Sequence, residues 1–254
     1  SSVSNFMHFL NSDVQKYDIT LNAVTLTASP SSAFGVFTYA NSPTTTTNTK
    51  KFTADGASTF TVTGAADVYF FGVTATTSSV SNLDFVLDSV TATLKSATIV
   101  HFLDFQPLTS VDHIKININN LDYNSVNSAV SEGKFIYFSL NTAFVDIDIA
   151  SSTLLMDSVD GVSSGHYRFE GTMSDSQIRV VDTQHTLTGA TYGRCVHLKY
   201  QVERTSLNFE RNTITYDITS DTSGEAIFLE LDTDGNRHRD NDFLFIDNTV
   251  DLHG

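Results

Sequence analysis

The chain has 254 residues, a formal net charge of −15 and a sequence pI of about 4.6. A surface this acidic repels phosphates and anionic headgroups, so neither nucleic acid nor a membrane is an expected partner. A single cysteine, Cys195, excludes an intrachain disulfide, and no apolar run is long enough for a membrane-spanning helix.

The first predicted element is a short helix within residues 1–16. Ser4 or Asn5 would cap it, and Phe6, Phe9 and Leu10 would turn inward. We expect this helix to close the N-terminal end of the fold.

From Tyr17 onward the chain repeats one phrase of alternating apolar residues, a polar turn and a second alternating stretch. Copies begin at Tyr17, Leu83, Ile114, Val145, Ile178, Leu207 and Phe243, with a weaker version at Phe60. From Leu83 the steps are roughly 29 to 36 residues, and another strand-like stretch, such as "KFIYFSL" from Lys134, follows most copies. A polar segment at 40–56 reads as a loop.

Each unit therefore holds two or three short strands and no helical period. A repeat of this length predicts a right-handed parallel β-helix over residues 17–254, whose coils stack at a spacing of about 4.8 Å. The alternative all-β folds are a β-sandwich or a jelly roll, in which the repeat would be a coincidence.

Residues at one place in successive units form what we call a column. The sixth position is mostly Asn or Asp, as a stacked tight turn requires: Asn22, Asp88, Asn119, Ala150, Thr183, Asn212 and Asn248. The second position alternates in charge between Asp84 and Arg179: Asp18, Asp84, Lys115, Asp146, Arg179, Asn208 and Leu244. The fifth position changes from apolar to charged: Leu87, Ile118, Ile149, Asp182, Arg211 and Asp247. These charges form either a buried ion ladder or, if the strand bends there, an exposed one.

With its Asn-rich turn, the phrase resembles the pectate-lyase-like and phage-tailspike-like β-helices over Tyr17 to Gly254. That resemblance implies a rigid stack whose outer face binds or cleaves polysaccharides.

The outward face of the first strand of the phrase is the candidate groove. Asp146, Asp148, Arg179 and Glu210 would share this face, at separations that a pair of glycosidase carboxylates can use. By analogy with β-helix lyases, Asp146 and Asp148 would bind calcium and Arg179 would be the base. Ordinary solvation of an outer face explains the same residues equally simply.

A second candidate is the insertion from Leu231 to Asp242. Asp232, Asp234, Asn236, Asp240 and Asp242 offer oxygen ligands for Ca²⁺, like the start of an EF-hand loop. Arg237 and Phe243 stand where that loop has its glycine and its glutamate. The alternative is a plain polar turn. All seven arginines lie between Arg168 and Arg239, which indicates either a site or a face that needs ion pairs.

Three functions fit. The first is a structural, glycan- or receptor-binding module of a tail spike, fibre or adhesin, located outside the cell, on its surface or on a virion. The second is a polysaccharide lyase or glycoside hydrolase, and the third a viral jelly-roll protein. The last phrase has no cap, so we expect either a piece of a longer chain or an end covered by another subunit, such as a homotrimer.

Overall fold

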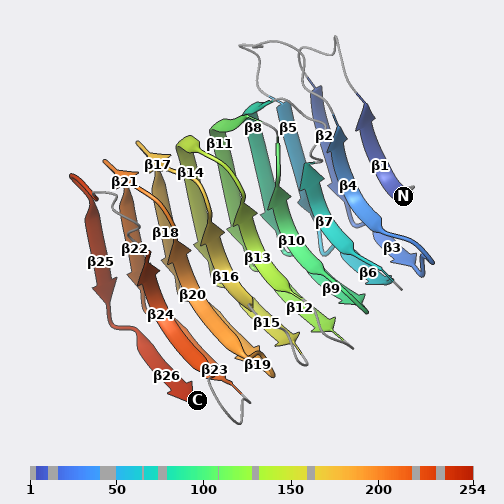
Figure 1. Cartoon of the computed structure of the whole chain (residues 1–254). Helices are drawn as coiled ribbons and strands as arrows, with labels where there is room; N and C mark the ends of the chain where they lie inside the picture. The colour runs from blue at the N-terminus through green and yellow to red at the C-terminus, as the bar shows by residue number, and fades with distance from the viewer. Residues whose placement is uncertain are drawn as a thin grey trace.

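The computed structural model describes residues 4–10, 17–40, 50–64, 66–73, 79–107, 109–127, 132–158, 164–218, 224–232 and 238–253. Every regular element in these residues is a β-strand, and the strands recur in the order A, B, C to build three parallel sheets (Figure 1). None of the described residues forms a helix suited to crossing a membrane.

Sheet A contains the second strand-like stretch of each unit. Its order is β1 (Ser4–Leu10), β4 (Phe34–Ala40), β7 (Val68–Val73), β10 (Val100–Phe105), β13 (Gly133–Phe138), β16 (Ser164–Phe169), β20 (Tyr192–Leu198) and β24 (Glu225–Leu231).

Sheet B contains the first half of the repeated phrase. Its order is β2 (Tyr17–Asn22), β5 (Lys50–Asp55), β8 (Ser79–Asp88), β11 (Ser110–Asn119), β14 (Thr142–Ala150), β18 (Gln177–Val181), β22 (Ser206–Glu210) and β25 (Asp242–Ile246). Two short strands, β17 (Met173–Ser174) and β21 (Val202–Glu203), extend it beside β14.

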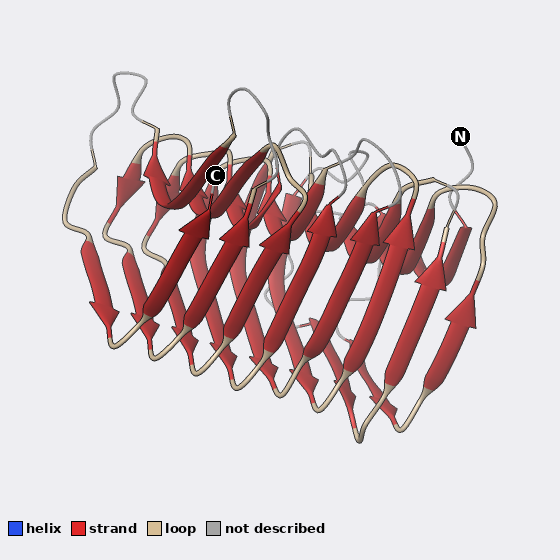
Figure 2. Ribbon diagram, turned by 90° about the horizontal axis from the view of Figure 1, so that it is seen from below, coloured by secondary structure: helices blue, strands red, loops and turns tan. Residues whose placement is uncertain are grey.

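Sheet C contains the second half of the phrase. Its order is β3 (Thr25–Ala28), β6 (Thr59–Thr63), β9 (Thr91–Ser96), β12 (Asp122–Asn127), β15 (Thr153–Ser158), β19 (Gln184–Thr188), β23 (Thr213–Asp217) and β26 (Thr249–His253). The three sheets enclose one elongated core, and the two ends of the chain lie at opposite ends of the stack (Figures 1 and 2).

The pairing confirms the parallel β-solenoid. Leu207 lies beside Phe243, and Ile114 lies between Leu83 and Val145. Hydrogen bonds between equivalent turn residues span 31, 29 and 36 positions of sequence. Because every pairing between named strands is parallel, the jelly roll, which is antiparallel, is contradicted.

Two local predictions were wrong. Residues 4–10, expected within a helix, form β1, which pairs with β4 along its length; Phe6 stays 43% exposed and contacts the edge of Phe37. Residues 50–55, expected within a loop, form β5, because alternate positions place Phe52 and Ala54 in the core. Residues 1–3, 11–16 and 41–49 lie outside the described residues.

The predicted columns omit the coil of β5, whose Lys51 and Asp55 lie beside Asp18 and Asn22. From Asp88 to Ala150 they are correct, and they then slip by two residues. Asp88, Asn119 and Ala150 are neighbours, but Ala150 continues to Val181, not to Thr183. The charge alternation of the second position is more regular than expected: Asp18, Lys51, Asp84, Lys115 and Asp146 lie side by side on successive strands.

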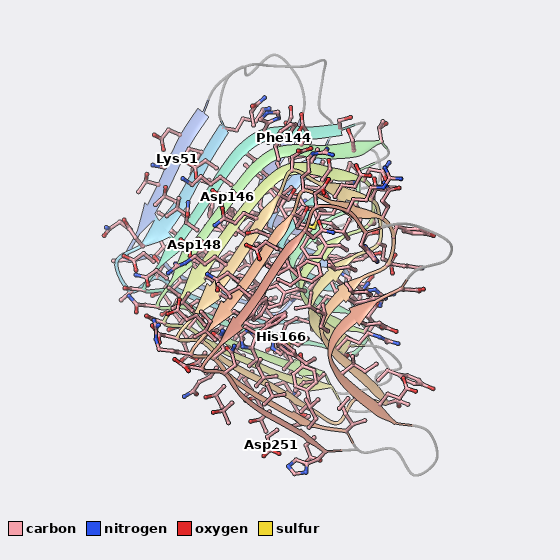
Figure 3. All side chains as sticks on the ribbon, turned by 90° about the vertical axis from the view of Figure 1, so that its left-hand side faces the viewer. Lys51, Phe144, Asp146, Asp148, His166 and Asp251 are labelled. Atoms are coloured by element: carbon pink, nitrogen blue, oxygen red, sulfur yellow. The ribbon has the colours of Figure 1, made fainter. Side chains whose placement is uncertain are left out.

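The interior changes character along the stack. In the N-terminal coils, Phe70, Phe102 and Phe135 stack in one inward column, with ring centroids 4.6 and 4.9 Å apart. The next residues in that column are His166 and Cys195, both fully buried. His166 lies inside the coil, whereas Asp146 and Asp148 lie outside it (Figure 3).

His166 anchors a polar cluster in the core. Its Nε2 lies 3.3 Å from the carbonyl oxygen of Leu154, so it carries the proton there, and Nδ1 accepts from the Tyr216 hydroxyl at 2.5 Å. Burial lowers the pKa of His166 to about 4, so the ring is neutral. Cys195 is also buried, and burial raises its thiol pKa to about 12.

Candidate functional site

Two sharp bends shape six successive coils around sheet B, from β8 to β25. The first bend lies within the strand at Asn82, His113 and Phe144, and before it at Asp175, Arg204 and Asp240. The second bend follows the strand, at Ser89, Asn120, Ser151, Asp182, Arg211 and Asp247. All twelve have φ between 47° and 57°, the left-handed region that Asn and Asp tolerate best. Each first-bend residue lies seven positions before its second-bend counterpart.

Polar side chains inside the bends hold the C-terminal coils together. At the first bend the Val145 amide donates to Ser176 Oγ at 3.1 Å, and the Thr205 amide donates to Asn241 Oδ1 at 3.0 Å. At the second bend the Thr183 amide donates to Asn212 Oδ1 at 3.0 Å. Each side chain therefore satisfies a backbone group of the preceding coil, which aligns the bends of these C-terminal coils.

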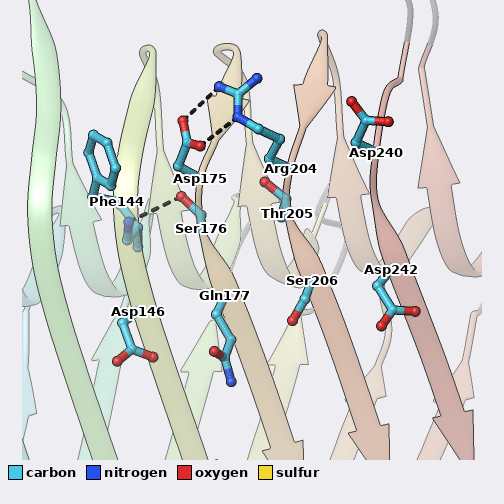
Figure 4. A pocket seen from close by; sticks show the side chains of 11 residues that line it. Phe144, Asp146, Asp175, Ser176, Gln177, Arg204, Thr205, Ser206, Asp240 and Asp242 are labelled. Atoms are coloured by element: carbon cyan, nitrogen blue, oxygen red, sulfur yellow. Dashed lines mark hydrogen bonds and ion pairs between the residues drawn. The ribbon is translucent and has the colours of Figure 1, made fainter.

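A groove of about 610 Å³ lies on the outer side of the first bend, along β14, β18, β22 and β25 (Figure 4). We call it the bend groove. One side is a row of outward polar side chains that are neighbours in register: Asp146, Gln177, Ser206 and Asp242. The other side is the row of bend residues Phe144, Asp175, Arg204 and Asp240. The groove thus runs along the stack and crosses four coils.

Phe144 is the unusual member of the bend groove. It adopts φ 52°, a conformation that is strained for a bulky residue, and yet its ring is 50% exposed. The ring stacks on His113 of the preceding coil, with centroids 4.7 Å apart and planes 24° apart. An exposed aromatic pair held at a strained position forms a flat apolar wall beside polar side chains.

Arg204 is neutralised by its neighbours. Its Nε and NH2 donate to the two carboxylate oxygens of Asp175 at 2.6 and 2.8 Å, and NH1 lies 3.2 Å from Glu203. The hydrogen bonds from Arg204 hold the pKa of Asp175 below its usual range. The same pairing recurs at the second bend, where Arg211 donates to both oxygens of Asp182 at 2.8 and 2.9 Å.

This second pairing decides whether the charged residues of the fifth position form a buried or an exposed ion ladder. Asp182 and Arg211 lie at the bend and are exposed, so the ladder is a surface one and not a buried one. Arginines in general are paired here: Arg168, Arg179, Arg194, Arg204 and Arg211 all make ion pairs. This supports the interpretation of the arginine-rich half as a face that needs ion pairs.

The structure brings only some of the predicted groove residues together. All four lie on the outer face of sheet B. Asp146 lines the bend groove, whereas Asp148 and Arg179 form a 3.0 Å ion pair in a smaller depression of about 350 Å³. Glu210 lies one row further along, beside Val181, and contacts Arg211. A catalytic role for these four residues stays a prediction.

The predicted calcium site likewise stays a prediction. Asp240 and Asp242 line the bend groove, Asp232 follows β24, and Asp234 and Asn236 lie outside the described residues. Among the residues that the structure describes, no group of three or more His, Cys, Asp or Glu side chains could hold a metal ion.

Sheet A carries a different polar cluster on its outer face. Lys134, only 3% exposed, lies 2.7 Å from Glu132 and 3.4 Å from the centroid of the Tyr137 ring. Arg168 bridges Glu132 and Glu170, and Tyr137 donates to Glu170 at 2.8 Å. Burial lowers the pKa of Lys134. In this closed network each charge has an opposite charge beside it, so it is better suited to holding coils together than to binding a ligand.

The sequence did not single out Phe144, His113, Gln177, Ser206, Asp175 or Arg204. A readable signal existed: Asp175 and Asp182, Arg204 and Arg211, and Asp240 and Asp247 are three like pairs with one spacing. They mark both bends in three consecutive coils.

Comparisons of the chain with protein-family models, curated proteins and solved structures returned no match.

Proposed function

We propose that this chain is a rigid structural module that binds glycans along the bend groove, as part of a tail spike, fibre or adhesin. We also propose that it belongs with the pectate-lyase-like and tailspike-like β-helices. We propose further that it is located outside the cell, on the cell surface or on a virion. The proposal also includes assembly as a homo-oligomer or within a longer chain.

The observation that carries the proposal is the Phe144 ring beside the polar row of Asp146, Gln177 and Ser206. A sugar ring has an apolar C–H face and hydroxyls around its edge. The exposed aromatic ring matches the first, and carboxylate, amide and hydroxyl groups match the second. Because strand positions repeat along the groove at about 4.8 Å, successive sugars of one chain meet similar partners.

The geometry supports glycan binding better than glycan cleavage. Asp148, a predicted calcium ligand, and Arg179, the predicted base, are engaged with each other as an ordinary surface ion pair. The bend groove itself is an open trough along the stack that spreads its contacts over four coils (Figure 4).

The test is binding of a panel of oligosaccharides, followed by calorimetry, to the wild type and to Phe144→Asn. Asparagine occupies the same bend at Asn82, so the variant keeps a residue that tolerates this φ. We expect an affinity loss of about tenfold, typical of an aromatic contact worth more than 1 kcal/mol.

The matched control is Tyr200→Asn, which removes an exposed aromatic ring elsewhere on the surface and is expected to leave binding unchanged. Equal affinity of wild type and Phe144→Asn for every bound glycan would refute the site. New reducing ends or unsaturated sugars would instead establish the enzyme alternative.

A further inference from the structure

We infer that the bend groove selects glycans with free amino groups over neutral ones, and excludes acidic glycans. This inference rests on the proposed function and names the ligand class of the same groove.

Uncompensated negative charge is the first observation. Among the described residues no ion pair uses Asp146, Asp240 or Asp242, although all three line the groove. The one cation in the lining, Arg204, is already held by Asp175 and Glu203. Lys115, the neighbour of Asp146 on β11, is the nearest cation in register, and it forms no ion pair with Asp146. The groove therefore presents three carboxylates that no described side chain holds in an ion pair.

The spacing of these carboxylates is the second observation. Asp146 and Asp242 stand at the two ends of one row, with neutral Gln177 and Ser206 between them. Three strand steps separate the ends by about 14 Å. A small cation cannot contact both ends, but an oligosaccharide lying along the stack passes both and can place an amine near each.

The aromatic wall is the third observation, and it separates a sugar from a simple cation. Phe144 flanks the row at the Asp146 end and offers an apolar face, on which a pyranose ring can pack while its amino group reaches the carboxylate. An ammonium group near the ring gains a further cation–π attraction.

Acidic sugars are repelled by the same carboxylates. A uronate in the groove would lie beside unpaired carboxylates on a chain of net charge −15. Like charges about 4 Å apart repel by about 1 kcal/mol even in water, which is about a fivefold loss of affinity for each such contact.

The experiment compares three hexasaccharides, of glucosamine, N-acetylglucosamine and galacturonic acid, by calorimetry at pH 6 in low and in high salt. The wild type is measured beside Asp146→Asn/Asp242→Asn. The control is Asp122→Asn/Asp217→Asn, which removes two exposed carboxylates from β12 and β23 of sheet C.

We expect the glucosamine hexamer to bind the wild type at least about fivefold more tightly than the N-acetylated hexamer in low salt. High salt and the Asp146→Asn/Asp242→Asn variant should both bring this ratio towards one, whereas the sheet C control should keep it. The galacturonate hexamer should not bind.

Other outcomes are decisive against the inference. If the N-acetylated hexamer binds through Phe144 as tightly as the glucosamine hexamer, the groove binds glycans but does not select amines. If no hexamer binds, or if Phe144→Asn changes nothing, the proposed function falls as well. Hexalysine that binds as tightly as the glucosamine hexamer, with both unaffected by Phe144→Asn, would show a plain attraction for cations and refute the glycan.

Discussion

The N-terminal and C-terminal coils of this stack have the same backbone but are held together by different chemistry. The N-terminal interior is a run of stacked phenylalanines, among them Phe70, Phe102 and Phe135. The C-terminal interior holds hydrogen-bonded polar groups instead, centred on His166 and Tyr216.

The bends show the same contrast. Inside the second bend the two middle coils place Val90 and Leu121, both buried, whereas later coils place Thr183 and Asn212 there. Ser58, in an earlier coil, is a polar exception in the N-terminal half. The two polar residues bond to backbone groups, Thr183 to the carbonyl of Val181 and Asn212 to that of Val180. A repeated backbone thus accepts either an apolar side chain or a polar one that satisfies neighbouring peptide groups.

The largest expected effect tests the aromatic half. Phe102→Ala removes a ring packed between Phe70 and Phe135, and we expect it to lower the free energy of unfolding by about 3 to 5 kcal/mol. Cys195→Ala, in the same column of the polar half, should cost about 1 kcal/mol. Urea unfolding followed by circular dichroism measures both, and equal losses would break the comparison.

The second prediction concerns pH and the polar half. His166 has a pKa of about 4 when folded and about 6.5 when unfolded, so below pH 6.5 the unfolded state binds more protons. Its contribution is present above pH 6.5 and lost as pH falls to 4, by about 3 kcal/mol. His185, also buried with a lowered pKa, acts in the same direction.

His166→Gln keeps hydrogen-bonding groups but cannot titrate. Its free energy of unfolding, measured in urea at pH 7, 5.5 and 4, should therefore fall less steeply than that of the wild type. His253→Gln, at an exposed position, is the control and should follow the wild type. Parallel pH curves for His166→Gln and wild type would contradict the assignment.

The smallest expected effect sharpens the contrast between the bends. Asn212→Leu copies the residue that serves at Leu121, but it removes the acceptor of the Thr183 amide and the donor to the Val180 carbonyl. We expect a loss of about 1 to 3 kcal/mol in the free energy of unfolding. The neighbouring exposed Thr213→Val should change it by less than about 0.5 kcal/mol. A neutral Asn212→Leu would show that the two kinds of bend are interchangeable one residue at a time.

Much of the fold could be predicted because the repeat is a physical requirement. Each coil must turn alternate side chains inward and then bend, so Leu207 and Phe243 recur in like surroundings and pair as expected. The alternating charges of Asp84, Lys115 and Asp146 follow from the same stacking.

The slip after Ala150 has a definite cause. The expected alignment matched apolar residues, and placed Ile178 beside Val145, whereas the strand pairs it with Ile147. The residue in line with Val145 is Ser176, whose hydroxyl accepts from the Val145 amide, so a polar residue stands where the pattern has an apolar one. A two-residue slip leaves inward and outward faces unchanged, which is why the four candidate site residues still share one face.

The groove could not be predicted in the same way, because it depends on the bend. Phe144 is a poor residue for a left-handed conformation, and nothing in the local sequence of Phe144 or His113 indicates a bend. Their position follows only from the stack, in which neighbouring coils impose one path on every strand.

The constant seven-residue interval between the bends gives the sheet B strand the same length in all six coils that have both bends. Adding or removing a whole coil changes the length of the groove by one side chain and leaves its cross-section intact. An insertion of one residue between the bends would move the inward side chains of the strand to its outer face, and the outward ones to the core. Such a protein can therefore lengthen or shorten only by whole coils. Insertions of other lengths fit only in the connections outside the sheet B strands.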